Sequence, residues 1–250
     1  MNTFNPFTLK GKTILVTGAS SGIGKAIAIA CSKMGAALLI SGRNAPRLQE
    51  TLLALEGDNH KQFIGDLTQT EILSAMLEEM PVIQGVVHSA GITKNLPFTF
   101  ATGEKMEEIM AVNFFAPAEL TRMLLKAKKL EKGSSIVFIS SVSGVWCAAP
   151  GGSMYAASKG AINGLVKGLA LDVAPKSIRV NCVNPGVIET HIFDEGIISA
   201  EQLEENKKQY PLKRFGTPEE VAFAVIYLLS DASAWVTGSN LLIDGGLTLQ

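Results

Sequence analysis

The sequence predicts an α/β protein with a doubly wound, mostly parallel sheet of seven strands and helices on both faces. Short β-rich segments alternate with longer helical patterns along the chain, which is typical of repeated strand–helix–strand units. Several strand segments, such as TILVT, GVVHS and SIVFIS, are almost continuously apolar, as expected of strands buried on both faces. No repeat and no linker rich in Pro, Gly or Ser divides the chain, so we expect one domain over residues 1–250.

The expected strands cover residues 12–17, 36–41, 61–64, 84–88, 134–139, 177–183 and 240–243. The helical windows are 22–34, 45–55, 68–79, 103–130, 153–172 and 217–230. The last window opens with Thr217 as a cap residue, Pro218 at the first helical position and acidic residues in the first turn. Residues 193–210 are polar, and we expect either a substrate lid over a cleft or an ordinary pair of surface helices.

Composition excludes several classes of protein. The 250 residues carry 22 Lys and Arg against 23 Asp and Glu, and 47% of them are hydrophobic, which excludes a disordered chain and argues against nucleic-acid binding. The longest apolar run, 221–229, is far shorter than the roughly 20 residues of a membrane span, and no secretory signal is recognised. Three distant cysteines and three histidines without an HExxH pattern predict neither a disulfide nor a metal site. We therefore expect a cytoplasmic protein without a membrane partner.

A glycine-rich turn follows the first strand and leads directly into a helix. A strand that turns into a helix in this way presents free backbone N–H groups and the positive end of the helix dipole, which suit a pyrophosphate. Small residues are needed because Cβ atoms would block the phosphates. The alternative is a tight turn with no ligand. The predicted cofactor-binding residues of this turn are Gly18, Ser20, Ser21, Gly22, Ile23 and Gly24.

The end of the second strand indicates which dinucleotide binds. A carboxylate there would bond the ribose 2′-OH of NAD, whereas an Arg would accept the 2′-phosphate of NADP. The segment Ser41-Gly42-Arg43-Asn44 has no carboxylate, so Arg43 favours NADP(H) over NAD(H), the alternative being a solvated loop Arg. After the third strand, Asp66 and Leu67 are placed to meet the adenine edge, although Asp66 could equally cap the helix that follows.

Tyr155 and Lys159 stand four residues apart at the start of a predicted helix, which puts them on one face. An ammonium beside a phenol favours the phenolate, so we expect the pKa of Tyr155 to fall below its ordinary value of about 10. Such a phenol could exchange a proton near neutral pH. The alternative is an ordinary surface pair. Upstream, Ser140, Ser141 and Ser143 follow the fifth strand and could hydrogen-bond a substrate oxygen.

The glycine motif TGASSGIG, the Tyr155/Lys159 pair, the serine upstream and Asn184-Pro185-Gly186 together resemble the short-chain dehydrogenase/reductase family, in order and interval, over nearly the whole chain. The resemblance implies a Rossmann fold and hydride transfer between NADP(H) and a ketone or secondary alcohol. It also implies that Tyr155 is the general acid/base, that Lys159 orients the nicotinamide ribose, that Ser141 polarises the substrate carbonyl and that Asn113 holds a water in a proton relay. Further cofactor contacts implied by the resemblance are Ser89, Ala90, Gly91, Pro185, Gly186, Ile188 and Thr190.

Two departures from the family pattern bear on the site. The family's Asn-Asn-Ala-Gly after the fourth strand is His88-Ser89-Ala90-Gly91 here, and the shorter Ser89 puts the support of that strand in doubt. We interpret His88 as a core histidine with satisfied hydrogen bonds rather than as a base. Ser141 lies one residue further upstream of the tyrosine than is usual, which an inserted residue within 145–150 would absorb, with Ser143 as the alternative serine.

The C-terminal pattern, from 211–220 through 236–246, resembles the 3-oxoacyl-carrier-protein reductase branch, an ending that sugar, polyol and steroid dehydrogenases share. An acyl-carrier-linked substrate would favour a basic patch, for which Lys207, Lys208, Lys213 and Arg214 are candidates unless they form a solvated helix face. The competing class is a catalytically silent NADP-binding regulatory protein. Family members are commonly homotetramers, and the segments 161–173 and 241–250 would fit such contacts, although a buried intradomain helix explains the first equally well.

Overall fold

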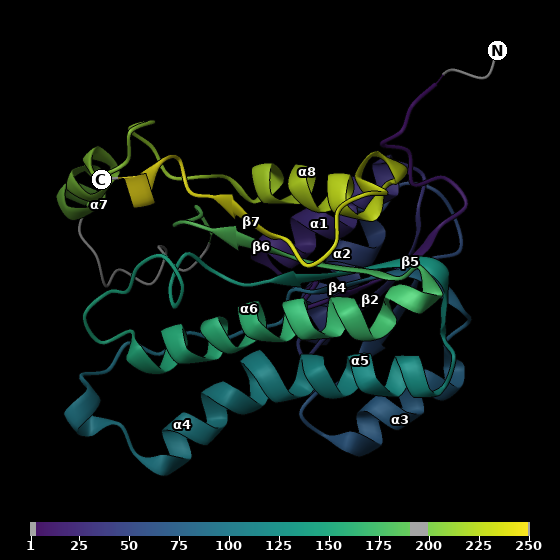
Figure 1. Ribbon diagram of the computed structural model, residues 1–250, viewed down its shortest axis with the longest axis horizontal. Helices are drawn as coiled ribbons and strands as arrows, with labels where there is room; N and C mark the ends of the chain where they lie inside the picture. Colours follow the sequence, from purple (N-terminus) through teal and green to yellow (C-terminus); the bar gives the residue numbers. More distant parts are fainter. Residues whose placement is uncertain (1–3, 191–199, 250) are drawn as a thin grey trace.

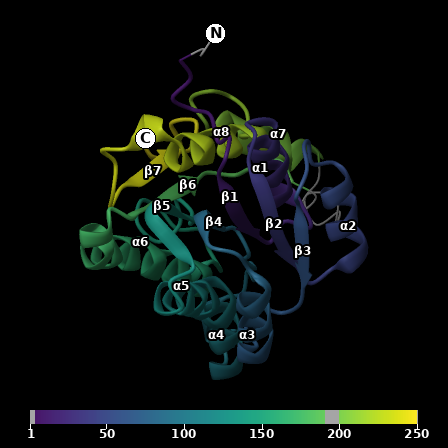
Figure 2. The ribbon, with the colours of Figure 1, turned by 90° about the vertical axis from the view of Figure 1, so that its right-hand side faces the viewer.

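The computed structural model describes residues 4–190 and 200–249. Within them, seven strands form one sheet in the order β3-β2-β1-β4-β5-β6-β7, and every strand pair is parallel (Figures 1 and 2). The expected doubly wound Rossmann-type fold is thus confirmed. The strands are β1 (Thr13–Thr17), β2 (Ala37–Gly42), β3 (Lys61–Ile64), β4 (Ile83–His88), β5 (Leu130–Ile139), β6 (Arg179–Pro185) and β7 (Asn240–Ile243).

The helices cover both faces of the sheet, as Figure 1 shows. Alternate strand residues supply the two cores: Ile14 and Val16 pack with α1 and α8, whereas Leu15 packs on the opposite face with residues of α3, α5 and α6. Burial on both faces explains why these strands read as continuous apolar runs. The helices are α1 (Gly22–Lys33), α2 (Ala45–Leu53), α3 (Thr70–Glu79), α4 (Gly103–Met110), α5 (Ala116–Lys126), α6 (Ser153–Val173), α7 (Ala200–Lys208) and α8 (Pro218–Leu229).

The helix expected over 103–130 is three pieces. A π-helical segment, Ala111–Phe115, separates α4 from α5, and β5 already begins at Leu130. Pro117 stands in the first turn of α5 and has no N–H to offer the carbonyl of Asn113, four residues earlier. The break in the regular helical bonding therefore falls on the segment that carries Asn113, and such π segments are frequent at functional sites.

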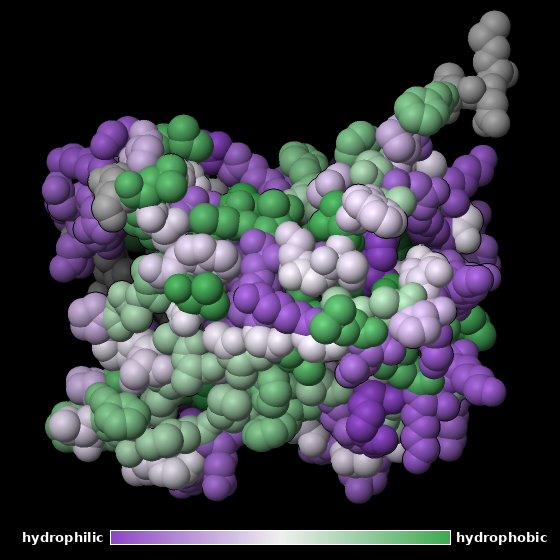
Figure 3. Space-filling view, in the orientation of Figure 1, coloured by the Kyte–Doolittle hydropathy of each residue, from purple (hydrophilic) through white to green (hydrophobic). Residues whose placement is uncertain are grey.

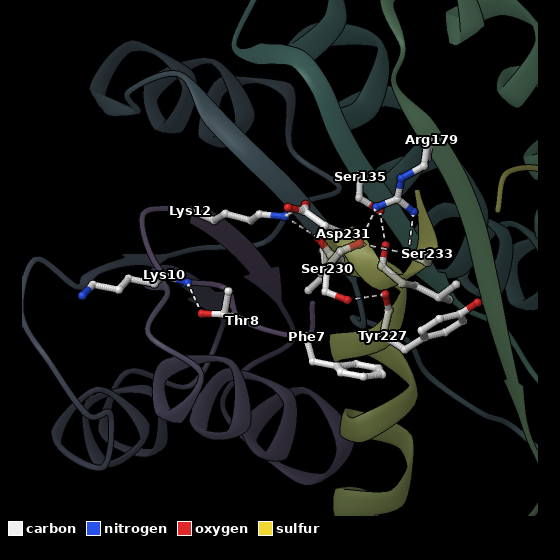
Figure 4. A network of polar contacts seen from close by, with 12 residues as sticks. Phe7, Thr8, Lys10, Lys12, Ser135, Arg179, Tyr227, Ser230, Asp231 and Ser233 are labelled. Atoms are coloured by element: carbon white, nitrogen blue, oxygen red, sulfur yellow. Dashed lines mark hydrogen bonds and ion pairs between the residues drawn. The ribbon is translucent and has the colours of Figure 1, made fainter. Parts of the chain in front are cut away.

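Two cations hold the C-terminal end of α8 beside the amino-terminal ends of the strands (Figure 4). Lys12 donates to the Leu229 carbonyl at 3.1 Å and to Asp231 at 2.8 Å. From β6, Arg179 donates to the Ser230 carbonyl at 3.2 Å. Positive charge at a helix C-terminus is favourable because it meets the negative end of the helix dipole. These contacts fix α8 to the sheet at the edge opposite the strand ends that carry the site.

The polar stretch 193–210 falls only partly within the described chain: residues 193–199 lie outside it, whereas 200–208 form α7 and the Tyr210 side chain is buried. A lid over a cleft remains a prediction. Among the described residues, no helix combines the length and apolar character needed to cross a membrane.

Candidate active site

A cavity of about 870 Å³ opens at the carboxyl ends of the strands. The last residues of five strands line it: Thr17, Gly42, His88, Ile139 and Pro185. The sheet order changes direction between β1 and β4, and ligands of doubly wound sheets bind at this crevice. Every cofactor-binding residue predicted from the sequence lines this one cavity: Gly18, Ser20, Ser21, Gly22, Ile23, Gly24, Arg43, Asp66, Leu67, Ser89, Ala90, Gly91, Tyr155, Lys159, Pro185, Gly186, Ile188 and Thr190.

The glycine-rich turn forms a cradle with no room for side chains. Gly18 has φ +68°, and a Cβ there would come within 2.7 Å of the Ala90 backbone. A Cβ on Gly24 would lie 2.3 Å from the Gly18 carbonyl oxygen. The N-cap residue of α1, Ser21, makes no side-chain cap bond, and the first turn of α1 holds no acidic residue. The first N–H groups of α1 are therefore left for a ligand at the cavity, and the residues present fit an anionic pyrophosphate.

Two arginines face the part of the cavity beyond β2. The guanidinium of Arg43 is largely exposed and lies 3.7 Å from an oxygen of Asp66. Arg47, in the first turn of α2, also lines the cavity. A Cβ on Gly42 would lie 3.2 Å from the Ser20 side chain, so the absence of a side chain there lets the glycine-rich turn pack against the end of β2.

Asp66 belongs to the turn after β3 rather than to a helix cap. One oxygen accepts from the Thr68 N–H at 3.0 Å and from the Thr68 hydroxyl at 2.8 Å, whereas the N-cap residue of α3 is Gln69. The bond from the Thr68 N–H, aided by Arg43, lowers the pKa of Asp66 below its usual value. The carboxylate is thus charged at neutral pH and holds the loop that meets Arg43.

Thr17 supports the end of β4 in place of the missing family asparagine. Its hydroxyl oxygen accepts from the backbone N–H groups of Ser89 at 3.1 Å and Ala90 at 3.2 Å, and its hydrogen is directed to the Val87 carbonyl at 3.4 Å. Sequence reasoning looked to the Ser89 side chain for this role. The end of the first strand supplies it instead, so the turn through Gly91 is held across the β1–β4 pair.

His88 is a core histidine, but its hydrogen bonds are only partly satisfied. Its Nε2 lies 2.8 Å from the Thr121 hydroxyl, and its ring stacks on Phe138 with centroids 4.6 Å apart. The Thr121 hydroxyl donates to the Pro117 carbonyl, so His88 carries its hydrogen on Nε2, and Nδ1 is left without a partner. Burial lowers the pKa of His88 to about 3, which keeps the ring neutral. It is not a base for neutral-pH chemistry.

Tyr155, Ser141 and Lys159 come together where α6 passes the end of β5. The Lys159 ammonium lies 5.7 Å from the centre of the Tyr155 ring and donates to the Ile139 carbonyl at 2.9 Å. The hydroxyl oxygen of Ser141 accepts from the Ser143 N–H at 3.1 Å.

Burial sets the pKa of both groups in this pair. It raises the pKa of Tyr155, against the opposing effect of a hydrogen bond with Ser141, so the expected lowering by Lys159 is wrong. The same desolvation lowers the pKa of Lys159 to about 8.

Asn113 lies behind the cavity rather than in its wall. Its side chain is buried, accepts from the Ile92 N–H at 2.8 Å, and donates to the Ile92 carbonyl at 2.9 Å and to Ser158 at 3.0 Å. These bonds join the π-helical segment to α6 and to the loop after Gly91. The side chain of Asn113 is therefore occupied in fixing the loop after Gly91, and the water relay expected at this residue stays a prediction.

A tight turn absorbs the extra residue between Ser141 and Tyr155. Gly144 has φ +103° and donates to the Cys147 carbonyl at 2.9 Å, and the Cys147 N–H returns to the Val142 carbonyl. Ser141 lines the cavity, whereas Ser143, the alternative serine, is not among its lining residues. Ser141 is thus the serine that the fold brings to Tyr155 and Lys159.

Sequence reasoning did not single out Arg47 or Tyr210. Arg47 carried a detectable signal, since it follows Arg43 by one helical turn at the start of a predicted helix. Tyr210 is buried, and its hydroxyl oxygen accepts from the Val187 N–H at 3.1 Å, which fixes the strand-end segment of Pro185 and Gly186. Nothing local predicts that contact, because it joins residues from separate elements.

No cluster of His, Cys, Asp and Glu able to hold a metal ion occurs among residues 4–190 and 200–249. The three cysteines are free, and burial raises the pKa of Cys31 to about 12 and that of Cys182 to about 11. Both buried thiols are therefore protonated at neutral pH.

A parallel doubly wound sheet with a glycine-rich turn and a cavity at its switch point is typical of dinucleotide-binding folds. The family model described as enoyl-(acyl carrier protein) reductase matches residues 18–248. The chain belongs to the short-chain dehydrogenase/reductase family, whose members are oxidoreductases that bind a nicotinamide cofactor.

Named relatives cover nearly the whole chain. Nodulation protein G of Rhizobium sp. (strain N33) is 38% identical over 247 residues, 97% of this chain and 99% of the relative. The 3-oxoacyl-[acyl-carrier-protein] reductase FabG of Thermotoga maritima is 35% identical over 96% of this chain and 99% of its own. A solved structure, described as a putative NAD(P) dependent gluconate 5-dehydrogenase from Beutenbergia cavernae with bound NADP at low occupancy, is 30% identical. It has a TM-score of 0.88 and covers 98% of this chain and 100% of that one.

Proposed function

We propose that this chain is an NADP(H)-dependent oxidoreductase that interconverts a ketone and a secondary alcohol, with Tyr155 as the general acid/base. The observation that carries the proposal is the convergence of Tyr155, Lys159 and Ser141 on the wall of the cavity that the glycine-rich turn also lines. A cofactor-binding regulatory protein has no physical need for a buried ammonium beside a phenol, because burying that charge costs free energy.

The preference for NADP(H) rests on charge beyond β2. Arg43 and Arg47 line this part of the cavity, and no carboxylate ends β2. Guanidinium groups suit a phosphate because they donate two parallel hydrogen bonds. Asp66 offers a negative charge nearby, but it already faces Arg43 and Thr68. The solved relative described with bound NADP supports the same preference.

The residues around Tyr155 can perform the proton half of a carbonyl reduction. The bound nicotinamide would supply a hydride to the carbonyl carbon, or accept one in the reverse direction. The raised pKa of Tyr155 keeps its phenol protonated at neutral pH, so it can donate the proton that the carbonyl oxygen gains. The Ser141 oxygen accepts from the Ser143 N–H, so its hydroxyl hydrogen, which bonds Tyr155 in this structure, is the donor that would polarise that carbonyl. Lys159, charged below a pKa of about 8, orients the cofactor ribose.

The four cations considered for carrier-protein docking all have partners on the chain itself. Lys207 lies 2.8 Å from Glu204, Lys208 lies 2.7 Å from Glu205, and Arg214 lies 2.6 Å from Glu220. Lys213 donates to the Lys208 carbonyl at 2.8 Å. This balance gives no support for an acidic carrier as partner. The proposed substrate is therefore a small carbonyl compound, with a carrier-linked 3-oxoacyl thioester tested beside it.

The test is oxidation of NADPH by the purified chain with a 3-oxoacyl thioester, a sugar ketone and a steroid ketone. We expect turnover with at least one of them, and a loss of kcat by a factor of about 10² to 10⁴ in Tyr155→Phe, while the Kd for NADPH stays unchanged. Binding of NADPH without turnover across the panel would favour the alternative, a catalytically silent NADP-binding regulatory protein. Full activity in Tyr155→Phe would refute the acid/base assignment.

We further propose a homotetramer. On the face shown in Figure 3, apolar and small residues gather over α6 and its neighbours. The exposed residues of α6 include Ala157, Gly164, Gly168 and Leu171, the last of these 78% exposed. The strand β7 is an edge strand, because among the described strands it pairs with β6 alone. Exposed strand edges are commonly covered in native proteins, and a second copy of this chain would cover this one. Light scattering that gives four chains supports this assembly, and a monomer rejects it.

A further inference from the structure

A buried polar network connects β6 to the back of the Tyr155/Lys159 pair. The side-chain amide of Asn163 donates to the Ser140 hydroxyl at 2.8 Å and to the Lys159 carbonyl at 2.8 Å. Its carbonyl oxygen lies 3.3 Å from the Cys182 sulfur, which in turn accepts from the Asn184 amide at 3.2 Å. These five side chains and backbone groups lie between α6 and the ends of β5 and β6.

The network is buried, and of its side-chain oxygens that of Asn184 has no hydrogen-bond partner. Ser140, Lys159, Asn163, Cys182 and Asn184 are all less than 9% exposed. Burial raises the pKa of Cys182 to about 11, so the sulfur keeps its hydrogen, and the side-chain oxygens of Asn240 at 3.0 Å and Asn163 at 3.3 Å share it as acceptors. Removing a partner from such a network leaves buried polar groups unsatisfied, which costs more than the bond contributed.

The network connects the chain segments that carry Ser141, Tyr155 and Lys159. Ser140 precedes Ser141, and its hydroxyl donates to the Lys159 carbonyl at 3.0 Å. Tyr155, Lys159 and Asn163 follow each other at intervals of one helical turn on one face of α6. The end of β5 is therefore tied to α6 at the turn between Tyr155 and Asn163.

A second tie at the same place depends on the ammonium. Lys159 Nζ donates to the Ile139 carbonyl at 2.9 Å. That ammonium is the group assigned above to the cofactor ribose, and of its three N–H donors one is used by Ile139, which leaves two for the ribose. The bonds of Asn163 and Ser140 use only the backbone carbonyl of Lys159, and they hold the helix whatever the ammonium does.

We propose that Asn163, acting with Cys182, is a positioning residue for the reaction: it fixes α6 against β5 and β6 and so sets Lys159 and Tyr155 relative to Ser141. This inference rests on the proposed function and goes beyond it, because Asn163 and Cys182 lie behind the cavity and are not among its lining residues.

The test compares Asn163→Ala, Cys182→Ala and Cys182→Ser. Gly103→Ala is the control, since a Cβ there meets nothing within 4 Å and Gly103 lies on α4, away from the network and from the α6 surface proposed for assembly. For each variant, kcat, the KM for NADPH, the pH profile of kcat and the melting temperature are measured. We expect Asn163→Ala to lower kcat roughly tenfold to hundredfold and to displace the pH profile, with the KM for NADPH changed by less than about threefold. Cys182→Ala moves the same quantities less, and Cys182→Ser, which keeps a hydrogen donor, stays within about twofold of wild type.

A wild-type kcat and pH profile in Asn163→Ala overturns the proposal, even if the melting temperature falls. Should Asn163→Ala not fold, the two cysteine variants decide. A lower kcat and a displaced pH profile in Cys182→Ala, with wild-type values in Cys182→Ser, support the proposal. The same kcat and pH profile in both cysteine variants overturn it.

A wild-type chain that turns over no carbonyl compound would defeat the proposed function, not this inference. In that case, the ionisation of Tyr155 is followed by its ultraviolet absorbance, as the difference from Tyr155→Phe. A shifted Tyr155 pKa in Asn163→Ala and Cys182→Ala, absent in Cys182→Ser, supports the positioning role. An unshifted pKa overturns it.

Discussion

The ammonium nitrogen of Lys159 lies 5.7 Å from the centre of the Tyr155 ring in the wall of the cavity, where desolvation is the largest influence on the pKa of both groups. Desolvation raises the pKa of Tyr155 and lowers that of Lys159 to about 8. Holding a charged ammonium in this place therefore opposes folding, and the site keeps it at the expense of stability. Functional groups retained in this way are typical of a trade-off between stability and activity.

Replacing Lys159 with Met should make the protein more stable and inactive. Below pH 8, both the folded and unfolded chains carry the proton, so the folded state bears the full cost of the buried charge. Between pH 8 and the ordinary pKa of 10.5, the folded state has lost the proton and the unfolded state keeps it, so wild-type stability recovers as pH rises. At pH 7 we expect Lys159→Met to raise the free energy of unfolding by up to about 3 kcal/mol, which is what a pKa shift from 10.5 to about 8 corresponds to, with the gain fading above pH 8. Urea unfolding at several pH values measures it.

Lys167→Met, on the exposed side of the same helix, is the control for that experiment and should change little. A Lys159→Met protein that is less stable than wild type at pH 7 contradicts the assigned cost of burial.

Coenzyme preference should depend on both Arg43 and Arg47. Replacing Arg43 with Ala removes a guanidinium that is available to a 2′-phosphate, so kcat/KM for NADPH should fall about tenfold to hundredfold while that for NADH changes less than about threefold. Arg47→Ala should act in the same direction, and the double variant should lose the preference. Steady-state kinetics with each coenzyme measure it. Lys25→Ala, whose ammonium lies 3.9 Å from Glu50, is the control, and an equal fall with both coenzymes would argue against a phosphate contact.

Much of the site was predictable because it is built from short consecutive segments at the ends of strands. Gly18 to Gly24, Ser89 to Gly91 and Pro185 to Thr190 each follow a strand that the apolar pattern identifies. Once the strands are parallel, their carboxyl ends meet at one edge, so these segments must converge. Tyr155 and Lys159 were predictable for a similar reason, since helical spacing alone puts them on one face.

The remainder depends on contacts between separate elements. The bonds of Thr17 to Ser89 and Ala90 require the register of β1 against β4, and those of Asn163 to Cys182 require that of α6 against β6. The direction of the Tyr155 pKa shift depends on how deeply packing buries the ring. A charge count showed the cations near 207–214, but only the fold shows that each has a partner.

Acid stability should be limited first by His88. Its pKa is about 3 in the folded protein against 6.5 ordinarily, so between these values the unfolded chain binds a proton that the folded chain does not. Stability contributed by the neutral ring is fully present above pH 6.5 and is lost as pH falls toward 3. His88→Asn, which removes the titrating group, should flatten the fall in unfolding free energy between pH 6.5 and about 4.5, where carboxylates begin to contribute. Chemical unfolding across that range measures the slope of unfolding free energy against pH. An unchanged slope in His88→Asn would show that another group causes the loss of stability.

The cradle at the start of α1 should fail when a single methyl group is added to Gly24. A Cβ there would stand 2.3 Å from the Gly18 carbonyl oxygen, so the turn must open and carry the first N–H groups of α1 away from the cavity. We expect Gly24→Ala to weaken NADPH binding at least tenfold, or by about 1.4 kcal/mol, and to lower the melting temperature. Gly103→Ala is the matched control, because Gly103 also stands in the first turn of a helix and a Cβ there meets nothing within 4 Å. Calorimetric titration with NADPH compares the two. If Gly24→Ala binds NADPH as tightly as Gly103→Ala does, the phosphates are held somewhere other than this turn.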